Sequence, residues 1–398
     1  MEMPGYEESI GNVFLDPAKL EIAYVPEQLP SREPELDTLA HRFAPALRGV
    51  GVCQQIAGPH GSGKTAVAKR FLEIFAEKAR KKGRNVKPIY INCERLWTQQ
   101  AVLCELIRQF KPTFAYRGHR WTELLAVLAA LIEKKGAHPL IVLDEVVPML
   151  QDGSSLIDLL ARYYECDLPP ISLILIALSN ADRLIGKATM SGFGHRIIRF
   201  EQYEKEHLGK ILDQRIELAF LPGVWPQDSR NLFLDTVEGY HDAKRMIRLL
   251  QDVGRLAEAQ QCVVIIPEHV RAVKLEHDPY DLRELIRPSD PSEAPTFNRH
   301  ELLALMGIAT RLKRRGYIAA REAEDAYQVA CEGYGVQWKS HRTYLRFLEH
   351  LAMYSVIDRR ERAATGGRGT LITIKEMPAC QLEDFLSGVL EHSLSPQV

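Results

Sequence analysis

The chain has 398 residues, 46% of them hydrophobic and 26% charged, which is ordinary for a globular protein and enough for two or three domains. The formal net charge of −1 argues against attraction of nucleic acid by the chain as a whole, but residues 294–374 hold 13 Lys and Arg against 8 Asp and Glu, a local net charge of +5. The seven cysteines are dispersed and form no C-x-x-C pair, which argues against a disulfide framework or a zinc site.

The first residues lack the apolar core of a secretory signal. The longest uninterrupted apolar run, residues 124–132, is too short to span a bilayer. Dispersed cysteines also fit a reducing compartment. We therefore expect a cytoplasmic protein.

A phosphate-binding loop is the first element with chemical meaning. A buried strand is predicted at 52–57 and a helix at 65–80, and between them Gly58-Pro-His-Gly-Ser-Gly-Lys-Thr65 fits the pattern G-x-x-x-x-G-K-[ST]. Lys64 would reach the β- and γ-phosphates of ATP, or the β-phosphate of ADP, and the Thr65 hydroxyl would bind Mg²⁺. The strand–loop–helix context disfavours a Gly-rich turn without a ligand. The predicted cofactor-binding residues are Gly58, Pro59, His60, Gly61, Ser62, Gly63, Lys64, Thr65 and Ala66.

Two further apolar strands end in polar residues. The strand at 140–144 ends in Asp144-Glu145, where Asp144 would hold Mg²⁺ and Glu145 would polarise the attacking water. The strand at 171–178 leads into Ser179-Asn180, and Asn180 would touch the γ-phosphate or that water. The alternatives are two solvated acids at a strand end and an Asn that caps a turn. The predicted catalytic residues are Lys64, Glu145 and Asn180, with Thr65 and Asp144 at the metal.

The order of the elements predicts three domains. Strands at 52–57, 88–92, 140–144, 171–178 and 196–200 alternate with helices, which predicts an α/β domain with a parallel sheet over residues 1–200. Residues about 201–275 show only helical periodicity, which predicts an all-helical domain over 201–288. A Pro- and Ser-rich linker at 287–295 then leads into a third domain over 289–398.

The third domain shows the plan of a winged helix. Helices are predicted at 299–314, 321–332 and 340–353, followed by strands at 354–360 and 370–374 around a Gly-rich turn. Basic residues of the third helix recur three to four positions apart and share a face that would contact DNA. The alternative is a solvated basic helix in a domain that docks proteins. The predicted DNA-binding residues here are Lys339, Arg342, Arg346, Arg359, Arg360, Gly367, Arg368 and Gly369.

With these motifs in place, the chain resembles the archaeal origin-recognition initiators, which are related to the eukaryotic origin recognition complex and its helicase loader. The resemblance rests on residues 24–33 (YVPEQLPSRE), the phosphate-binding loop, Tyr90-Ile-Asn-Cys93, Asp144-Glu145, residues 178–180 and the final hairpin. It implies an AAA+ ATPase domain, a helical lid and a DNA-binding winged helix. It also implies that the opening segment forms part of the adenine pocket, through Tyr24, Val25 and Arg32.

The chain departs from this family at several positions. The family's Gly-Asp-Ala-Arg run at the start of a lid helix is matched by His241-Asp-Ala-Lys244, so that a Lys stands where an Arg would contact the nucleotide. No arginine finger aligns, although Arg183 and Arg196 are nearby in the sequence. Residues 111–120 occupy the place of the family's DNA-contacting insertion, and there Arg117 and Arg120 would contact the DNA backbone.

The leading hypothesis from these observations is an ATP-dependent initiator that binds double-stranded origin DNA, hydrolyses ATP slowly as a switch, and works with other initiator paralogues and the replicative helicase. An alternative is a winged-helix DNA-binding regulator that holds ATP or ADP as a structural ligand and loads no helicase. A third is a mobile-element or defence ATPase whose winged helix contacts proteins.

Overall fold

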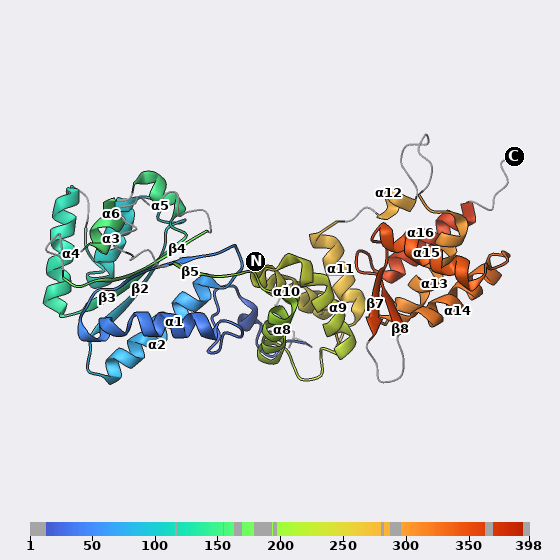
Figure 1. The fold of residues 1–398 in the computed structure, drawn as a ribbon, viewed down its shortest axis with the longest axis horizontal. Helices are drawn as coiled ribbons and strands as arrows, with labels where there is room; N and C mark the ends of the chain where they lie inside the picture. Colours follow the sequence, from blue (N-terminus) through green and yellow to red (C-terminus); the bar gives the residue numbers. More distant parts are fainter. Residues whose placement is uncertain are drawn as a thin grey trace, which may run out of the picture. The chain divides into compact units, whose positions relative to one another are not determined.

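A computed structural model describes residues 13–115, 118–153, 155–162, 169–178, 193, 197–279, 282–286, 296–362 and 369–392 (Figure 1). The chain divides into two units. One comprises Ile22–Ile211 and His241–Arg245, and the other comprises Met1–Glu21, Leu212–Tyr240 and Met246–Val398. The predicted domain boundaries at residues 200 and 288 stay predictions. No helix in the described part of the chain is long and apolar enough to cross a membrane.

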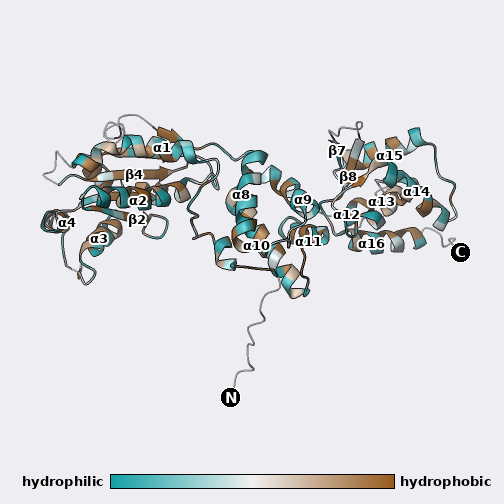
Figure 2. Ribbon diagram, turned by 90° about the horizontal axis from the view of Figure 1, so that it is seen from below, coloured by the Kyte–Doolittle hydropathy of each residue, from teal (hydrophilic) through white to brown (hydrophobic). Residues whose placement is uncertain are grey.

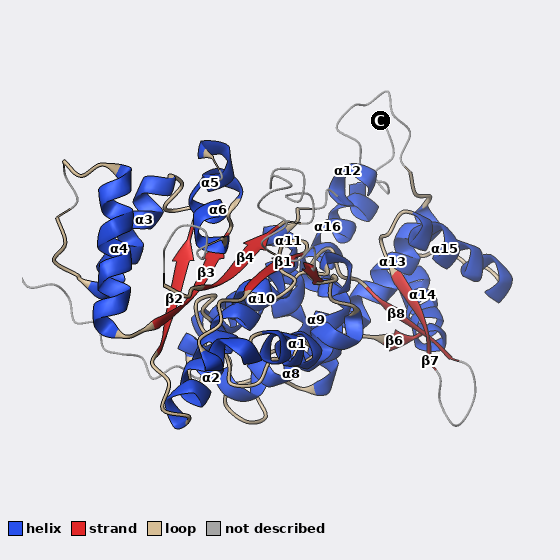
Figure 3. Ribbon diagram, turned by 60° about the vertical axis from the view of Figure 1, so that its left-hand side comes forward, coloured by secondary structure: helices blue, strands red, loops and turns tan. Residues whose placement is uncertain are grey.

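The first unit is built around a five-stranded parallel sheet (Figure 3). Its strands are β1 (Cys53–Ala57), β2 (Val86–Asn92), β3 (His138–Asp144), β4 (Ser172–Ala177) and β5 (Ile197–Arg199). They lie in the order β2-β3-β4-β1-β5, so β4 separates β1 from β3. The predicted parallel sheet is confirmed, and its strand order places the carboxyl ends of β1, β4 and β3 side by side.

Alternate residues of the central strands face two separate hydrophobic clusters, because successive side chains of a strand point to opposite faces. On β3, Ile141 and Leu143 belong to one cluster, whereas Leu140 and Val142 belong to the other. Every residue of β4 is buried, and the strand is hydrophobic along most of its length (Figure 2). This pattern is typical of a parallel strand that is covered on both faces.

Helices cover both faces of this sheet (Figure 1). On one face, the rings of Phe43, Phe71 and Phe75 pack together, with centroids 5.2 to 6.4 Å apart. On the other face, Leu103, Leu128 and other buried residues of four helices meet the strands. The helices and 3₁₀ helices up to β4 are η1 (Pro17–Leu20), α1 (Glu33–Arg42), η2 (Ala44–Arg48), α2 (Lys64–Lys81), α3 (Gln99–Phe110), α4 (Trp121–Lys135), α5 (Val147–Asp152) and α6 (Ser155–Ala161).

The segment from residue 205 to residue 286 is helical where it is described, as the periodicity predicts. Its elements are α8 (Lys205–Ala219), α9 (Gln227–Val237), η5 (Glu238–Tyr240), α10 (Ala243–Ala259), α11 (Pro267–His277) and α12 (Leu282–Ile286). Both α8 and α10 begin in the first unit and end in the second. Pro267 stands in the first turn of α11, where its missing N–H leaves no hydrogen bond unmade.

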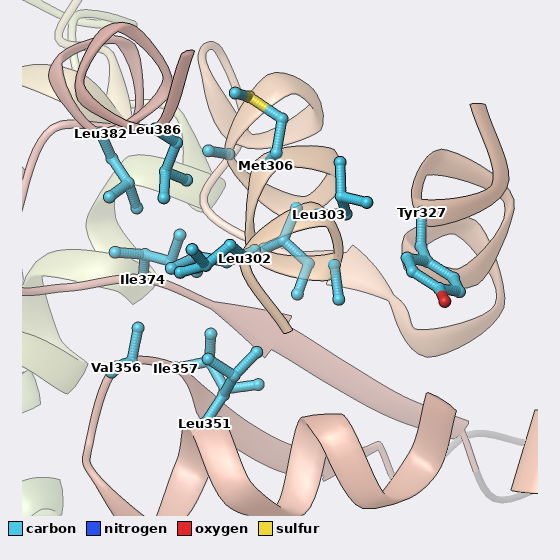
Figure 4. Packing of buried hydrophobic residues seen from close by; sticks show 14 of the residues in the cluster. Leu302, Leu303, Met306, Tyr327, Leu351, Val356, Ile357, Ile374, Leu382 and Leu386 are labelled. Carbon is cyan, nitrogen blue, oxygen red and sulfur yellow. The ribbon is translucent and has the colours of Figure 1, made fainter. Parts of the chain in front are cut away.

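The second unit ends in a winged helix. Its elements are α13 (Arg299–Leu312), β6 (Ile318–Ala319), α14 (Ala320–Gly333), α15 (His341–Met353), β7 (Asp358–Arg362), β8 (Gly369–Thr373) and α16 (Ala379–His392). The strands form an antiparallel sheet in the order β6-β8-β7. Figure 4 shows how Leu302 and Leu303 of α13, Leu351 of α15 and Leu382 of α16 point into one core. The sequence analysis missed β6 and α16.

The first predicted strand of the wing begins later than expected. Residues 354–357 form a turn instead of a strand, because Ser355 adopts a left-handed backbone with φ of 57°. The N–H groups of Ser355 and Val356 donate to the last turn of α15, and Val356 and Ile357 are buried in the core. The apolar residues that suggested a strand therefore fill the space between α15 and β7.

A buried arginine ties α11 to the winged helix within the second unit. The Arg271 side chain has no exposed surface, and burial lowers the pKa of its guanidinium. All three of its nitrogens donate hydrogen bonds, at 2.7 to 3.2 Å. The acceptors are the Glu268 carboxylate and the carbonyls of Leu312, Arg315, Gly316 and Ile374. A buried carbonyl without a donor is costly, so this side chain holds several segments of the winged helix in place.

We predict that Arg271→Lys lowers the free energy of unfolding of the second unit by about 3 kcal/mol, because a buried ammonium cannot reach the carbonyls that the planar guanidinium serves. Chemical denaturation of the full chain measures the change. The matched control is Arg255→Lys, since the Arg255 side chain is 64% exposed and pairs only with Asp252 among the described residues. Equal changes in the two variants would contradict a structural role for Arg271.

Candidate functional site

The loop at 58–65 runs from the carboxyl end of β1 to the first turn of α2. Gly61 and Gly63 have φ of 68° and 90°, a left-handed conformation that glycine adopts without a steric penalty. The start of the loop packs closely against Phe200, since a Cβ added to Gly58 would lie 2.5 Å from the Phe200 carbonyl oxygen. These residues therefore form the strand–loop–helix that the motif predicts, with the helix amino terminus available for an anion.

Lys64 lies inside the loop and is 5% exposed. Its ammonium donates to the carbonyl oxygens of Gly58 and Pro59, at 2.8 and 2.6 Å. Burial lowers the pKa of Lys64, while the negative charges of Glu145, Asp144 and Asp242 oppose that shift. Of the remaining predicted loop residues, Ser62 is buried, Pro59, Thr65 and Ala66 are half-buried, and His60 is exposed.

Asp144 and Thr65, the two residues assigned to the metal, are joined by a hydrogen bond. The Thr65 hydroxyl donates to Oδ2 of Asp144 at 2.7 Å, and the Tyr90 hydroxyl donates to the same oxygen at 2.8 Å. The backbone N–H of Glu145 donates to Oδ1 at 2.9 Å. A carboxylate and a hydroxyl at this distance are oxygen donors of the kind that Mg²⁺ prefers, so the residues fit the metal.

Glu145 follows directly and has an unusual backbone. Its φ is 51°, which is uncommon for a residue with a side chain and is typical of a functional turn. Burial and the neighbouring charge of Asp144 raise the pKa of Glu145, while Lys64 and His60 lower it. A carboxylate with a raised pKa beside a nucleotide loop suits a general base.

Several predicted residues lie outside the described residues. They are Asn180, Arg183, Arg196, Arg117, Gly367 and Arg368. Arg120, at the amino end of α4, is described and exposed. β4 ends at Ala177 between the carboxyl ends of β1 and β3, so the chain leaves the sheet beside the loop and Asp144 just before Asn180.

Arg32, which the resemblance places in an adenine pocket, hydrogen bonds to other groups of the protein. Its guanidinium donates to the carbonyl of Ser62 at 3.0 Å, to the carbonyl of Glu201 at 2.7 Å and to Glu35 at 2.7 Å. It also lies over the ring of Tyr203, 4.2 Å from the centroid. Arg32 therefore stabilises the backbone of the phosphate-binding loop at Ser62. Tyr24 and Val25 are half-buried, and their place in an adenine pocket stays a prediction.

Asp242 is a site residue that the sequence analysis did not select. Its Oδ1 accepts the N–H groups of Lys244 and Arg245, at 2.7 and 3.1 Å, and so caps α10. The same carboxylate touches the loop, since a Cβ on Gly61 would lie 1.9 Å from Oδ1. An Asp directly before the helical run was the signal for such a cap.

Two residues near Asp242, His241 and Lys244, are the positions at which the sequence departs from the related family. His241, where the related family has Gly, adopts φ of 52°, and its Nδ1 lies 2.9 Å from the carbonyl oxygen of Tyr203. This bond offsets part of the strain of a left-handed residue. Lys244 is exposed.

The winged helix presents an exposed basic face. Arg342 and Arg346 are exposed on α15, while Tyr344, Phe347 and Leu348 of the same helix are buried. Ser340 caps α15, as predicted. Lys339 is exposed beside Trp338, an aromatic residue with 45% exposure that the sequence analysis did not select. Base stacking on aromatic rings is a common device of nucleic-acid binding.

The two arginines at the start of β7 differ. Arg359 is exposed, and so is Gly369 at the start of β8. Arg360 instead forms ion pairs with Asp235 and, at 3.3 Å, with Glu238 of the helical segment. Successive side chains of a strand point to opposite faces, so Arg359 and Arg360 lie on different faces of the sheet. Arg360 is half-buried and its charge is paired, and its contact with DNA stays a prediction.

Comparisons with known proteins agree with this geometry. Residues 28–176 match the AAA ATPase domain family, and residues 293–379 match the Cdc6 C-terminal winged helix domain family. An ORC1-type DNA replication protein of Thermococcus kodakarensis is 26% identical over 358 residues, which are 87% of this chain and 84% of that protein.

Two solved structures have a similar fold. The crystal structure of a Cdc6 protein from Pyrobaculum aerophilum has a TM-score of 0.78 at 24% identity, covering 96% of this chain and 100% of that one. The Aeropyrum pernix ORC1 protein, solved in complex with DNA, has a TM-score of 0.61 at 26% identity, covering 96% of this chain and 99% of that one.

The sheet order, the phosphate-binding loop and the C-terminal winged helix define an AAA+ ATPase of the winged-helix type. More particularly, the chain carries a Cdc6-type C-terminal winged helix and is similar over most of its length to ORC1-type DNA replication proteins.

We predict that Gly61→Ala weakens the binding of a fluorescent ATP analogue at least about tenfold, because its Cβ would displace Asp242 as well as strain the backbone by about 1 kcal/mol. The matched control is Gly83→Ala. Gly83 has φ of 67° but nothing within 4 Å of an added Cβ, so it carries the strain alone. Unchanged binding in both variants would show that the contact between Asp242 and the loop has no part in the site.

Proposed function

We propose that this protein is an ATP-dependent, DNA-binding replication initiator that recognises origin DNA and helps to recruit the replicative helicase. The observation that carries the proposal is the position of Asp242. Its carboxylate touches the phosphate-binding loop at Gly61 and caps α10. α10 continues into the unit that contains the winged helix, so a change at the loop has a covalent path toward the DNA-binding domain.

At the nucleotide, the contacts of Lys64, Thr65 and Asp144 support the roles proposed for them. Lys64 and the loop N–H groups would bind the phosphates, and Thr65 and Asp144 would hold Mg²⁺. The metal, when bound, neutralises charge on the phosphate oxygens. Glu145 would accept a proton from the attacking water, and Asn180 would orient that water. We place Tyr24, Val25 and Lys244 near the adenine and phosphates on the resemblance alone.

We infer that hydrolysis is slow and acts as a switch. Lys244 supplies a point charge where the family has a bidentate Arg, so its grip on the γ-phosphate would be weaker. A slow enzyme that keeps ATP bound can hold one conformation for the time that assembly on DNA requires.

DNA would lie on the winged helix and on the ATPase domain. The exposed α15 residues Arg342 and Arg346, with Lys339, would reach base edges or phosphates in the major groove. Arg359, Arg368 and the wing glycines would contact the backbone, and Arg117 and Arg120 would add contacts from the other unit. The related Aeropyrum pernix ORC1 protein was solved in complex with DNA, which supports DNA as the partner.

A second candidate is a DNA-binding regulator that holds ATP or ADP as a structural ligand and loads no helicase. It is favoured by Lys244, which is exposed and stands at the usual Arg position. Bound ADP that resists exchange, without turnover, would support this candidate over the initiator.

We predict that Glu145→Gln retains ATP binding and loses turnover, whereas Lys64→Ala loses tight binding.

The pKa of Glu145 is raised, so its carboxylate becomes protonated at a higher pH than that of an ordinary Glu. Wild-type turnover should therefore decline as the pH falls through this raised pKa. A raised carboxyl pKa also makes the ionised group unfavourable to folding at neutral pH, so Glu145→Gln should raise the melting temperature there and lose this advantage in acid.

A phosphate-release assay between pH 5 and pH 8 and equilibrium nucleotide binding measure these effects. Turnover that survives in Glu145→Gln would require another base. Unchanged ATP affinity in Lys64→Ala would contradict the assignment of the loop.

We predict that the protein, with ATP at physiological salt, retains one or a few loci from sheared DNA of its own genome, and that Arg342→Ala loses this enrichment. The matched control is Arg255→Ala, which removes an exposed positive charge outside the winged helix. A locus beside replication genes would favour the initiator. Uniform retention of all DNA fragments that decreases steeply with salt concentration would indicate contacts to phosphates alone. That outcome would contradict the proposal of sequence recognition.

A further inference from the structure

The motif Tyr90-Ile-Asn92 lies on β2, beside the proposed nucleotide site, and the roles given above do not explain it. Tyr90 and Asn92 are two residues apart on a strand, so they share one face of the sheet. β2 pairs with β3 in parallel register, with Asn92 opposite Asp144 and Tyr90 opposite Val142. The motif therefore lies directly beside the residue assigned to the metal.

Tyr90 shares an acceptor with Thr65. Both hydroxyls donate to Oδ2 of Asp144, Tyr90 at 2.8 Å and Thr65 at 2.7 Å. They reach this oxygen from different elements, Thr65 from α2 and Tyr90 from the neighbouring strand. Thr65 belongs to the proposed metal ligands, whereas Tyr90 makes its contact from the strand and can hold the carboxylate as a supporting residue.

Asn92 shares the face of β2 with Tyr90. Its carbonyl oxygen Oδ1 accepts the backbone N–H groups of Glu94 and Arg95 at 2.9 and 3.2 Å, so its side chain holds the turn that follows the strand. The Tyr90 hydroxyl is the group of the motif that donates to the Asp144 carboxylate.

A positive charge lies on the ring of this tyrosine. The Lys69 ammonium lies 4.5 Å from the ring centroid, in a cation–π contact from the side of α2. A cation on the ring withdraws electron density, which makes the hydroxyl a stronger donor.

We propose that Tyr90 is a positioning residue of the magnesium site, with its hydroxyl holding Asp144 in the orientation that the metal needs. The proposal rests on the proposed ATP site. Residues that hydrogen bond to a metal ligand fix its direction, and their loss typically weakens metal affinity 10- to 100-fold. Nucleotide contacts of the loop do not involve Tyr90, so its loss should affect the metal and leave metal-free nucleotide binding intact.

The test is Tyr90→Phe, which removes one oxygen and keeps the ring. Binding of a fluorescent ATP analogue is titrated in EDTA and then against increasing Mg²⁺. We expect affinity in EDTA to stay within about twofold of wild type, and the Mg²⁺ concentration at half-effect to rise about tenfold. Tyr317→Phe is the matched control, because the Tyr317 hydroxyl also donates to a carboxylate, that of Asp235, in the other unit.

A second variant, Lys69→Met, keeps the hydroxyl and removes the cation from the ring. We expect a smaller rise in the required Mg²⁺, about two- to fivefold, in line with the strength of an exposed cation–π contact. This variant keeps the test valid where Tyr90→Phe folds poorly, as its melting curve in EDTA would show.

The experiment tests the proposed ATP–magnesium site and the positioning role of Tyr90 separately. A wild-type protein whose nucleotide affinity ignores Mg²⁺ would remove the proposed ATP–magnesium site itself. Where the wild type does depend on Mg²⁺, a Tyr90→Phe curve that matches it, or a loss of affinity that is equal with and without the metal, would overturn the positioning role. A shift in Mg²⁺ dependence confined to Tyr90→Phe and Lys69→Met, and absent from Tyr317→Phe, would support it.

Discussion

The convergence of two hydroxyls on one oxygen of Asp144 depends on the strand order of the sheet. With β4 between β1 and β3, the loop after β1 and the acidic end of β3 meet across the tip of the intervening strand. β2, on the far side of β3, then brings Tyr90 to the same carboxylate. A different order of the same strands would keep every motif and lose the site, because ligands bind where the carboxyl ends of particular strands are neighbours.

The second constraint is the contact between the loop and Asp242. Only a glycine leaves room there, and the same carboxylate starts α10. The phosphate-binding loop and the first turn of that helix thus share one acidic side chain, and any phosphate that enters the loop approaches this negative charge. Asp242 is one of three carboxylates, with Asp144 and Glu145, whose negative charge opposes the effect of burial on the pKa of Lys64.

Within the second unit, positive charge serves two purposes. Arg271 is buried and satisfies the backbone of the winged helix, and Arg360 pairs with the acids of the helical segment. Arg342 of α15 and Arg359 of β7 are exposed, as are Arg311, Arg314 and Arg321 of the same domain. The local excess of Lys and Arg over residues 294–374 therefore includes charge, that of Arg360, which is paired within the protein.

The sequence by itself determined the phosphate-binding loop, the acidic strand end, the parallel sheet and the winged helix, because each of these depends on residue type and on spacing along the chain. Only the tertiary structure decided the surroundings of Arg32, Tyr90, Asp242 and Arg360. Arg32 reaches Glu201 across 169 positions, and Arg360 reaches Glu238 across 122. No periodicity encodes such pairs, because they form through space between elements whose neighbours are set by how the whole sheet and the helices pack.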